Sequence, residues 1–337
     1  MFEQLIILFI VTILFNFFLR KYNFLLDKKY FFDHKSIVSK NKKIPLSGGV
    51  IFFITLFFFE GLNNLLIIAS FFILLIGILS DFNYLISPGK RLVCQAMIVI
   101  IFLNTSNINI VDLRLNYLNI LLTNKYFSVV FTSFCLLILI NGTNFIDGIN
   151  NSVLGYYLFI SLGLLYLADR YHFKIDQLML VYFCGILSIL YIFNSINKLY
   201  LGDSGAYLVS FVFGIVLIKF SLENSNISPY FIMSLLWYPA LENIFSIIRK
   251  KIQNKKFYKP DGAHLHQLLY LYVKKKKIVP KIFLNTFTGF LINFYNIIFF
   301  LIIVNYPFFT KFLIFACFFN IVLYTSFYFW LKKTINV

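Results

Sequence analysis

Long runs of apolar residues, separated by short polar stretches, make up most of this chain. A helix needs about 20 mostly apolar residues to cross the hydrocarbon core of a bilayer, at 1.5 Å rise per residue. We predict eleven such spans, several of them short enough to need flanking polar residues or longer neighbours. They cover residues 5–19, 48–59, 65–79, 92–103, 127–140, 153–168, 178–193, 206–218, 230–248, 282–304 and 312–331. The pattern therefore predicts an all-α polytopic membrane protein, with residues 1–337 forming a single transmembrane domain.

Composition points to the same class. Hydrophobic residues make up 60% of the 337 residues and charged residues only 13%, against about 25% charged in an average soluble domain. The four cysteines all lie inside apolar runs without C-x-x-C spacing, so neither a disulfide framework nor a zinc site is indicated. They are expected to be small buried hydrophobic residues.

The distribution of charge predicts an orientation. The first apolar run lacks a basic segment before it and a small-residue cleavage site, and Arg20 and Lys21 follow it directly, so we expect a retained span with its N-terminus outside. Eleven spans then place the C-terminus and loops 20–47, 80–91, 141–151, 194–204 and 249–281 in the cytoplasm. These inner segments hold 24 of the 30 Lys and Arg residues, as the positive-inside rule requires. The two most basic loops would also favour anionic membrane lipids or phosphorylated ligands, with ordinary topogenic charge as the alternative.

The polar residues that are rare elsewhere gather in these inner segments. Asn141, Asn144, Asp147 and Asn150 recur every three residues, so a helical turn would place their oxygens along one face. Such a face suits a hard cation or a sugar nucleotide. The alternative is an ordinary turn, because Asn, Gly and Asp favour turns.

A second acid stands at the start of the eighth span. Asp203 lies between Gly202 and Gly205, where free backbone amides at a helix N-terminus let a phosphate or its magnesium ion approach. Magnesium prefers a few carboxylate or amide oxygens together with substrate phosphates, which Asp203 and Asn144 would supply. Helix capping by Asp203 is the alternative.

Two further inner loops carry candidate groups. Asp81, after Ser80 at the end of the third span, would position or deprotonate a phosphate that Lys90 and Arg91 bind; the alternative is helix capping and topogenic charge.

The last inner loop contains His264 and His266. Without a cysteine or a third histidine nearby they do not indicate a zinc site. They are better suited to act as proton donors or cationic partners of phosphate.

Taken in order, and preceded by the P-x-x-G-G motif at residues 45–49, these motifs resemble the polyprenyl-phosphate N-acetylhexosamine-1-phosphate transferases of glycosyltransferase family 4. The resemblance covers most of the chain, from Ile44 to His266. The P-D-x-x-H-L-H form of the last loop looks most like the undecaprenyl-phosphate GlcNAc-1-phosphate transferase branch.

The resemblance implies a role for each motif residue. It implies a Mg²⁺ cofactor, with Mn²⁺ as an alternative, bound by Asn144 and Asp203. It also implies that Lys90, Arg91, Asn141 and Asn150 bind substrate, and that the catalytic residues are Asp81, Asp147, His264 and His266.

The chain departs from the family pattern at two positions, where Ser80 and Asn150 replace acids. We expect a variant subfamily rather than an inactive relative. The implied reaction transfers HexNAc 1-phosphate from a UDP-HexNAc, with UDP-GlcNAc favoured, to undecaprenyl phosphate; UMP leaves, and the first lipid-linked sugar of a cell-envelope glycan forms.

The implied location is the bacterial cytoplasmic membrane, with the active site on its cytoplasmic face, and no nucleic-acid partner is expected. The alternatives are another donor (UDP-QuiNAc, UDP-FucNAc or UDP-GalNAc), a non-catalytic membrane relative, or a transporter. A homodimer is left open.

Overall fold

The computed structural model describes residues 2–27, 44–58, 63–254 and 262–335. Within these ranges the regular elements are all helices, which confirms the predicted all-α class. Their bounds are α1 Phe2–Lys21, α2 Gly48–Thr55 with the 3₁₀ turn η2 Leu56–Phe58, α3 Asn64–Asp81, α4 Pro88–Ser106, α5 Asn116–Leu122, α6 Lys125–Ile146, α7 Ser152–Tyr171, α8 Gln177–Ser195, α9 Gly202–Glu223, α10 Pro229–Leu235, α11 Trp237–Ile252, α12 Leu265–Lys275, α13 Leu284–Ile303 and α14 Thr310–Ile335.

The protein is a polytopic membrane protein. Among the described residues, eight helices are long and apolar enough to cross a bilayer, and α10 with α11, bent by 73°, would make a ninth. The two other predicted spans correspond to the short apolar helix Gly48–Phe58 and to α4, whose first turn carries Lys90 and Arg91. By length and composition, eight or nine of the eleven predicted spans are thus confirmed as helices able to cross a membrane.

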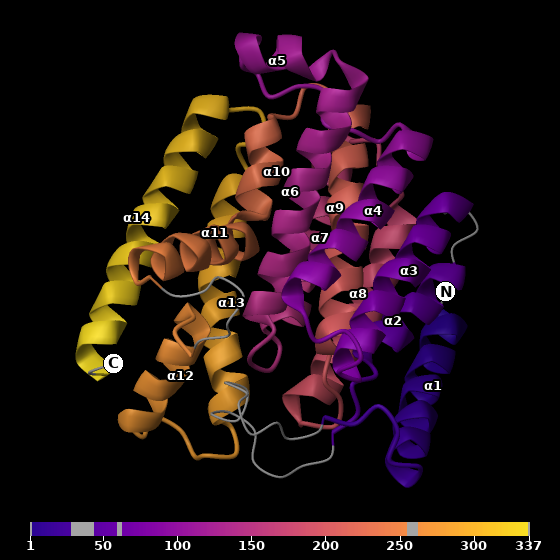
Figure 1. The fold of residues 1–337 in the computed structure, drawn as a ribbon, viewed down its shortest axis with the longest axis vertical. Coiled ribbons are helices and arrows are strands. Elements are labelled where there is room, and N and C mark those ends of the chain that lie inside the picture. Colours follow the sequence, from indigo (N-terminus) through magenta and orange to yellow (C-terminus); the bar gives the residue numbers. More distant parts are fainter. Residues whose placement is uncertain (1, 28–43, 59–62, 255–261, 336–337) are drawn as a thin grey trace.

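Helix α9 lies at the centre of the bundle, packed against α2, α3 and α6 (Figure 1). In its most apolar window 83% of the residues are buried, against 22% to 61% in the other seven spans. A helix that is apolar on every side is expected in the interior of a membrane bundle. Gly77 lets α3 approach α9, because a Cβ there would lie only 2.2 Å from the Cα of Ser204. The N-terminus of α9 is therefore held close to the C-terminus of α3.

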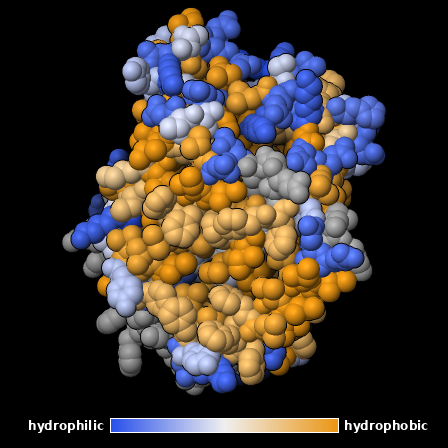
Figure 2. All heavy atoms as spheres, turned by 90° about the vertical axis from the view of Figure 1, so that its right-hand side faces the viewer, coloured by the Kyte–Doolittle hydropathy of each residue, from blue (hydrophilic) through white to orange (hydrophobic). Residues whose placement is uncertain are grey.

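The outer surface suits a lipid environment. Figure 2 shows a broad hydrophobic area across the middle of the molecule, with hydrophilic residues gathered above it. Large apolar side chains such as Leu14 and Phe17 on α1 and Phe315 and Phe318 on α14 are exposed. In water such a surface would be unfavourable. In a bilayer it faces acyl chains.

Three of the predicted inner loops are shorter than expected. Helix α3 runs to Asp81 and α4 starts at Pro88, α6 continues to Ile146, and only residues 196–201 join α8 to α9. A helix satisfies its own backbone hydrogen bonds, so it can continue past the last apolar residue into the interface. The prediction from hydropathy alone ended α3 and α6 too early and started α4 and α9 too late.

Candidate functional site

The N-terminus of α9 is capped by a carboxylate from another helix. Asp81, the last residue of α3, accepts hydrogen bonds from the backbone N–H of Asp203 (2.9 Å) and of Ser204 (3.1 Å). Gly202 precedes them with a φ of +76°, and a Cβ there would lie 2.8 Å from Asp81 Oδ2. This left-handed conformation and the close approach both favour glycine. The negative charge of Asp81 thus faces the positive end of the α9 dipole.

Arg91 joins three groups beside this cap. Its Nη1 donates to Asp203 Oδ2 at 2.9 Å, to Ser80 Oγ at 2.5 Å and to the Tyr207 hydroxyl at 3.3 Å. The Ser80 hydroxyl in turn donates to Asp203 Oδ2 at 2.7 Å. The side chains of Arg91 and Asp203 are only 19% and 14% exposed, so the ion pair is screened less than a surface pair. Ser80 therefore orients Asp203 and Arg91 at once.

The two asparagines of α6 have different surroundings. Asn144 Nδ2 donates to the Tyr207 hydroxyl at 3.2 Å, so it reaches the group that Arg91 also contacts. Asn141 instead donates to Gln95 Oε1 at 3.2 Å, a contact between α6 and α4. Lys90 is exposed in the first turn of α4, and its side chain has no hydrogen bond or ion pair with the described residues. Asn144 thus shares the Tyr207 hydroxyl with Arg91, whereas the Asn141 side chain contacts Gln95 and Lys90 is exposed.

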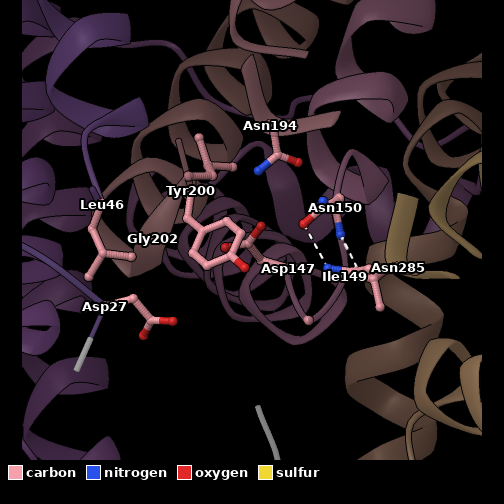
Figure 3. A pocket seen from close by; sticks show the side chains of 11 residues that line it. Asp27, Leu46, Asp147, Ile149, Asn150, Asn194, Tyr200, Gly202 and Asn285 are labelled. Atoms are coloured by element: carbon pink, nitrogen blue, oxygen red, sulfur yellow. Dashed lines mark hydrogen bonds between the residues drawn. The ribbon is translucent and has the colours of Figure 1, made fainter. Parts of the chain in front are cut away.

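A pocket opens next to the α9 cap (Figure 3). Asp147, at the C-terminal cap of α6, is one of the two acids that line it among the described residues, and the other is Asp27, which follows α1. Tyr200 lies between them in the view. The pocket is lined by Asp27, Leu46, Asp147, Gly148, Ile149, Asn150, Asn194, Tyr200, Leu201, Gly202 and Asn285. Gly202 connects this pocket to the capped end of α9.

Asn150 lines the pocket, but it does not extend the face formed by Asn141 and Asn144. Helix α6 ends at Ile146, so the predicted series of four oxygens breaks after Asp147. The Asn150 side chain donates to Asn197 Oδ1 at 3.0 Å and accepts from Asn285 Nδ2 at 2.7 Å. In this geometry Asn150 ties the turn after α6 to the start of α13.

The two predicted histidines are buried, and neither is among the residues that line the pocket. His264 is the N-cap of α12, and its Nδ1 lies 2.9 Å from Glu242 Oε1 in α11. The rings of His264 and His266 are nearly parallel, with centroids 5.7 Å apart and planes 13° apart. A Cβ on Gly148 would lie 2.1 Å from His266 Nε2, so His266 rests against the backbone of a pocket-lining residue. Pro260 and Asp261 of the same motif lie outside the described residues.

A comparison with known families matches the part of the chain from α3 to α9. Residues 63–221 match the model of glycosyl transferase family 4. Over this range, just under half of its length, the chain is a member of glycosyl transferase family 4. Together with the relative described next, the match identifies an enzyme of the polyprenyl-phosphate sugar-1-phosphate transferase type. The matched range includes Asp81, Arg91, Asn144 and Asp203, while the two histidines follow it.

A named relative of this family 4 enzyme occurs in Thermotoga maritima. It is called undecaprenyl-phosphate alpha-N-acetylglucosaminyl 1-phosphate transferase, and it is 25% identical over 270 residues, which are 80% of each chain. That range is long enough to include spans on both sides of the central helix α9.

The family implies a magnesium ion, and the local donor set fits one. Among the described residues no three His, Cys, Asp or Glu side chains lie together as a metal cluster. Magnesium, however, is usually held by one or two carboxylates and by substrate phosphates. Asp203 and Asn144 offer a carboxylate and an amide oxygen, and both residues adjoin the Arg91–Tyr207 contact. These two residues would hold the ion, with phosphate oxygens completing its coordination.

Sequence reasoning missed several residues of this region. Glu242 carried a usable signal, because it is the only acid in the apolar run 230–248 and an ionisable residue within a span points to function. Tyr207 and Tyr324 carried none among 22 tyrosines. Asp27 and Asn285 become recognisable only when the pocket brings them together.

Proposed function

We propose that this enzyme transfers HexNAc 1-phosphate from a UDP-HexNAc to undecaprenyl phosphate. UDP-GlcNAc is the first donor to consider, because the relative in Thermotoga maritima carries that specificity in its name. The observation that supports the proposal best is the arrangement of Asp81, Arg91 and Asp203 at the N-terminus of α9, next to the pocket.

The reaction is an in-line phosphoryl transfer. An oxygen of the lipid phosphate attacks the phosphorus that carries the sugar, and a new P–O–P bond forms. The bond from that phosphorus to the bridging oxygen of UDP breaks, and UMP leaves with the bridging oxygen. The protein has little covalent work to do in such a transfer, so positioning and charge neutralisation account for most of the catalysis.

The chain's own residues supply that positioning. The N-terminus of α9, capped by Asp81, holds the Asp81 and Asp203 carboxylates next to the pocket, and Arg91 adds a fixed cation beside them. Lys90, exposed in the same turn of α4, would neutralise a further phosphate charge. A magnesium ion held by Asn144 and Asp203 would offset charge on the pyrophosphate. Asp147 would contact the nucleotide sugar from the pocket side, and the two histidines would act from behind Gly148 in the pocket wall.

The orientation belongs to the same proposal. We place loops 20–47, 80–91, 141–151, 194–204 and 249–281 and the C-terminus in the cytoplasm, because they hold 24 of the 30 Lys and Arg residues. The N-terminus would then lie outside, and the site would open to the cytoplasmic leaflet of the inner membrane. There both the soluble donor and the lipid acceptor are accessible.

A direct assay tests the proposal. Detergent-purified protein with undecaprenyl phosphate and Mg²⁺ is given UDP-GlcNAc, UDP-GalNAc, UDP-QuiNAc or UDP-FucNAc, and mass spectrometry identifies the lipid product. We expect one sugar pyrophosphate lipid and one UMP per turnover. Asp203→Asn should abolish transfer, whereas Asp112→Asn, at an exposed acid before α5, should not. No product from any donor, or full activity of Asp203→Asn, would refute the proposal.

A further inference from the structure

A fully buried carboxylate lies behind the histidine motif. Glu242, in the middle of α11, has 0% of its surface exposed. Its Oε1 lies 2.9 Å from His264 Nδ1, and its Oε2 accepts a hydrogen bond from the Tyr324 hydroxyl of α14 at 2.7 Å. Three helices, α11, α12 and α14, therefore meet at this one side chain. The proposed function uses His264 and His266 but gives Glu242 no role, so the contact calls for an explanation of its own.

The contact determines where the His264 proton lies. An isolated buried carboxylate is costly, so it persists only with donors on its oxygens. An ionised carboxylate only accepts hydrogen bonds, so His264 must carry a proton on Nδ1 to bond it. In the neutral ring Nε2 then bears no proton. The hydrogen bond at one ring nitrogen thus sets the state of the other.

The contact also determines the position of both imidazoles. The His264 ring packs on Phe145 of α6 with centroids 5.2 Å apart and lies nearly parallel to His266. His266 in turn rests against Gly148, which lines the pocket. A change at Glu242 would therefore be transmitted through two stacked rings to the pocket wall.

A second buried ion supports the same segment. Arg249 follows Glu242 by about two turns in α11. It donates to the backbone carbonyl of Ala263, the residue before His264. Its guanidinium also lies over the Tyr328 ring of α14, 5.7 Å from the centroid. Among the described residues, His264, His266, Tyr238 and Tyr324 interact with Glu242, and Arg249 interacts with Tyr324.

We propose that Glu242, oriented by Tyr324, is a positioning residue for the two imidazoles. It fixes His264 with its proton on Nδ1 and holds the His264–His266 pair against the turn after α6, which lines the pocket proposed for a nucleotide sugar. The inference about the substrate rests on the proposed function. The inference about the imidazoles rests on geometry alone.

The ring state can be measured without any turnover. The chain has only four histidines, so ¹⁵N-histidine labelling gives four imidazole spin systems, and the signal missing from His264→Asn assigns His264. We expect the wild-type His264 to show a protonated Nδ1. Glu242→Gln should move His264 toward the Nε2-protonated tautomer, and Tyr324→Phe should shift the same signal less. Tyr295→Phe removes a hydroxyl that bonds Asn320 between α13 and α14, and it should leave all four signals in place.

Activity provides the second measurement. Removing a group that orients a catalytic side chain lowers activity by about 10- to 100-fold. We expect Glu242→Gln to lower kcat within that range with little change in the KM for the nucleotide sugar, and Tyr324→Phe to lower it less. Wild-type imidazole signals and kcat in a folded Glu242→Gln protein would overturn the inference, as would an effect on KM alone. If Glu242→Gln does not fold, Tyr324→Phe decides by the same two criteria.

The two proposals fail in different ways. If the wild-type protein transfers no sugar phosphate from any donor, the proposed function is wrong, while the ¹⁵N spectra still decide whether Glu242 fixes His264. If transfer occurs but His264 carries its proton on Nε2, the positioning role is wrong and the proposed function stands.

Discussion

Asp81 and Asp203 both lie at the N-terminus of α9, but their carboxylates have different partners. Asp81 accepts from the backbone amides of Asp203 and Ser204, so it is bound as a helix cap. Asp203 is paired with Arg91 and accepts from Ser80. The capping alternative for Asp81 is thus realised, at the end of α9 that adjoins the pocket.

We expect Asp81→Asn to weaken both the cap and the transfer reaction. An amide offers one oxygen where the carboxylate offers two, so one amide of α9 loses its partner and the dipole loses a facing charge. The loss of stability should be about 1 kcal/mol, and transfer should fall about 100-fold because the phosphate site is displaced. Thermal unfolding and the lipid-product assay measure these effects.

A matched control exists at another helix. Asp176 caps α8 by accepting from the Met179 amide at 2.9 Å, far along the chain from the α9 cap. Asp176→Asn should cost similar stability and leave transfer unchanged. Equal losses of transfer in both variants would mean that Asp81 acts through general stability alone.

Ser80 is the residue at which this chain departs from the acidic pair of its family. Ser80→Ala removes the hydroxyl that bonds both Arg91 and Asp203, and hydrogen bonds to charged groups contribute about 1.5–3 kcal/mol. We expect transfer to fall about tenfold or more. Ser70→Ala, on the same helix, removes a buried hydroxyl that has no hydrogen-bond partner among the described residues and should leave activity unchanged. Unchanged activity in Ser80→Ala would show that the hydroxyl is dispensable.

At the scale of elements, the site depends on how closely α3 and α9 pack. The Asp81 cap can form only if the end of α3 lies within hydrogen-bond reach of the first amides of α9. The approach at Gly77 brings the two backbones together one turn before the cap. The packing of two helices therefore determines the geometry of two carboxylates.

Gly77→Ala tests this dependence. Its Cβ would fall within 3 Å of α9 backbone atoms that cannot move independently, so the helices must separate at a cost of about 1–3 kcal/mol. We expect a lower unfolding temperature together with reduced transfer. Gly163→Ala in α7 meets only a Val304 methyl at 3.9 Å and should be stabilising by about 0.5–1 kcal/mol, as usual in a helix interior. Normal transfer by Gly77→Ala would contradict the argument.

At the scale of the whole molecule, the candidate residues gather toward one end of the bundle. Helix α12, the C-terminus of α14 and the start of α13 lie near the lower end in Figure 1, and α5 lies at the opposite end. The pocket is formed by segments near the same lower end, from residue 27 to residue 285. This arrangement places the proposed reaction at one membrane interface.

Labelling from one side of the membrane tests the orientation. In a variant lacking Cys94, Cys135, Cys184 and Cys317, a cysteine replacing exposed Lys125 should react with an impermeant maleimide added outside intact cells. A cysteine replacing exposed Lys276 should react only after the membrane is opened. Labelling of both from outside, or the reverse pattern, would refute the proposed topology.

The sequence by itself determined the membrane class, the helical fold and the residue types at the site. Hydropathy is a local property of consecutive residues, so it locates helices well, although it ended α3 and α6 too early and missed the short helices α5 and α12. The motif residues Asp81, Asn144 and Asp203 were likewise recognisable from their local spacing.

Only the tertiary structure decided which groups meet. Asp81 and Asp203 are separated by 122 residues, and Glu242 and Tyr324 by 82. Local spacing contains no information about such partners, because they depend on which helices pack together and at what rotation. For this reason the capping role of Asp81, the inward turn of Asn150 toward α13 and the contact of Glu242 with His264 became visible only in the folded bundle.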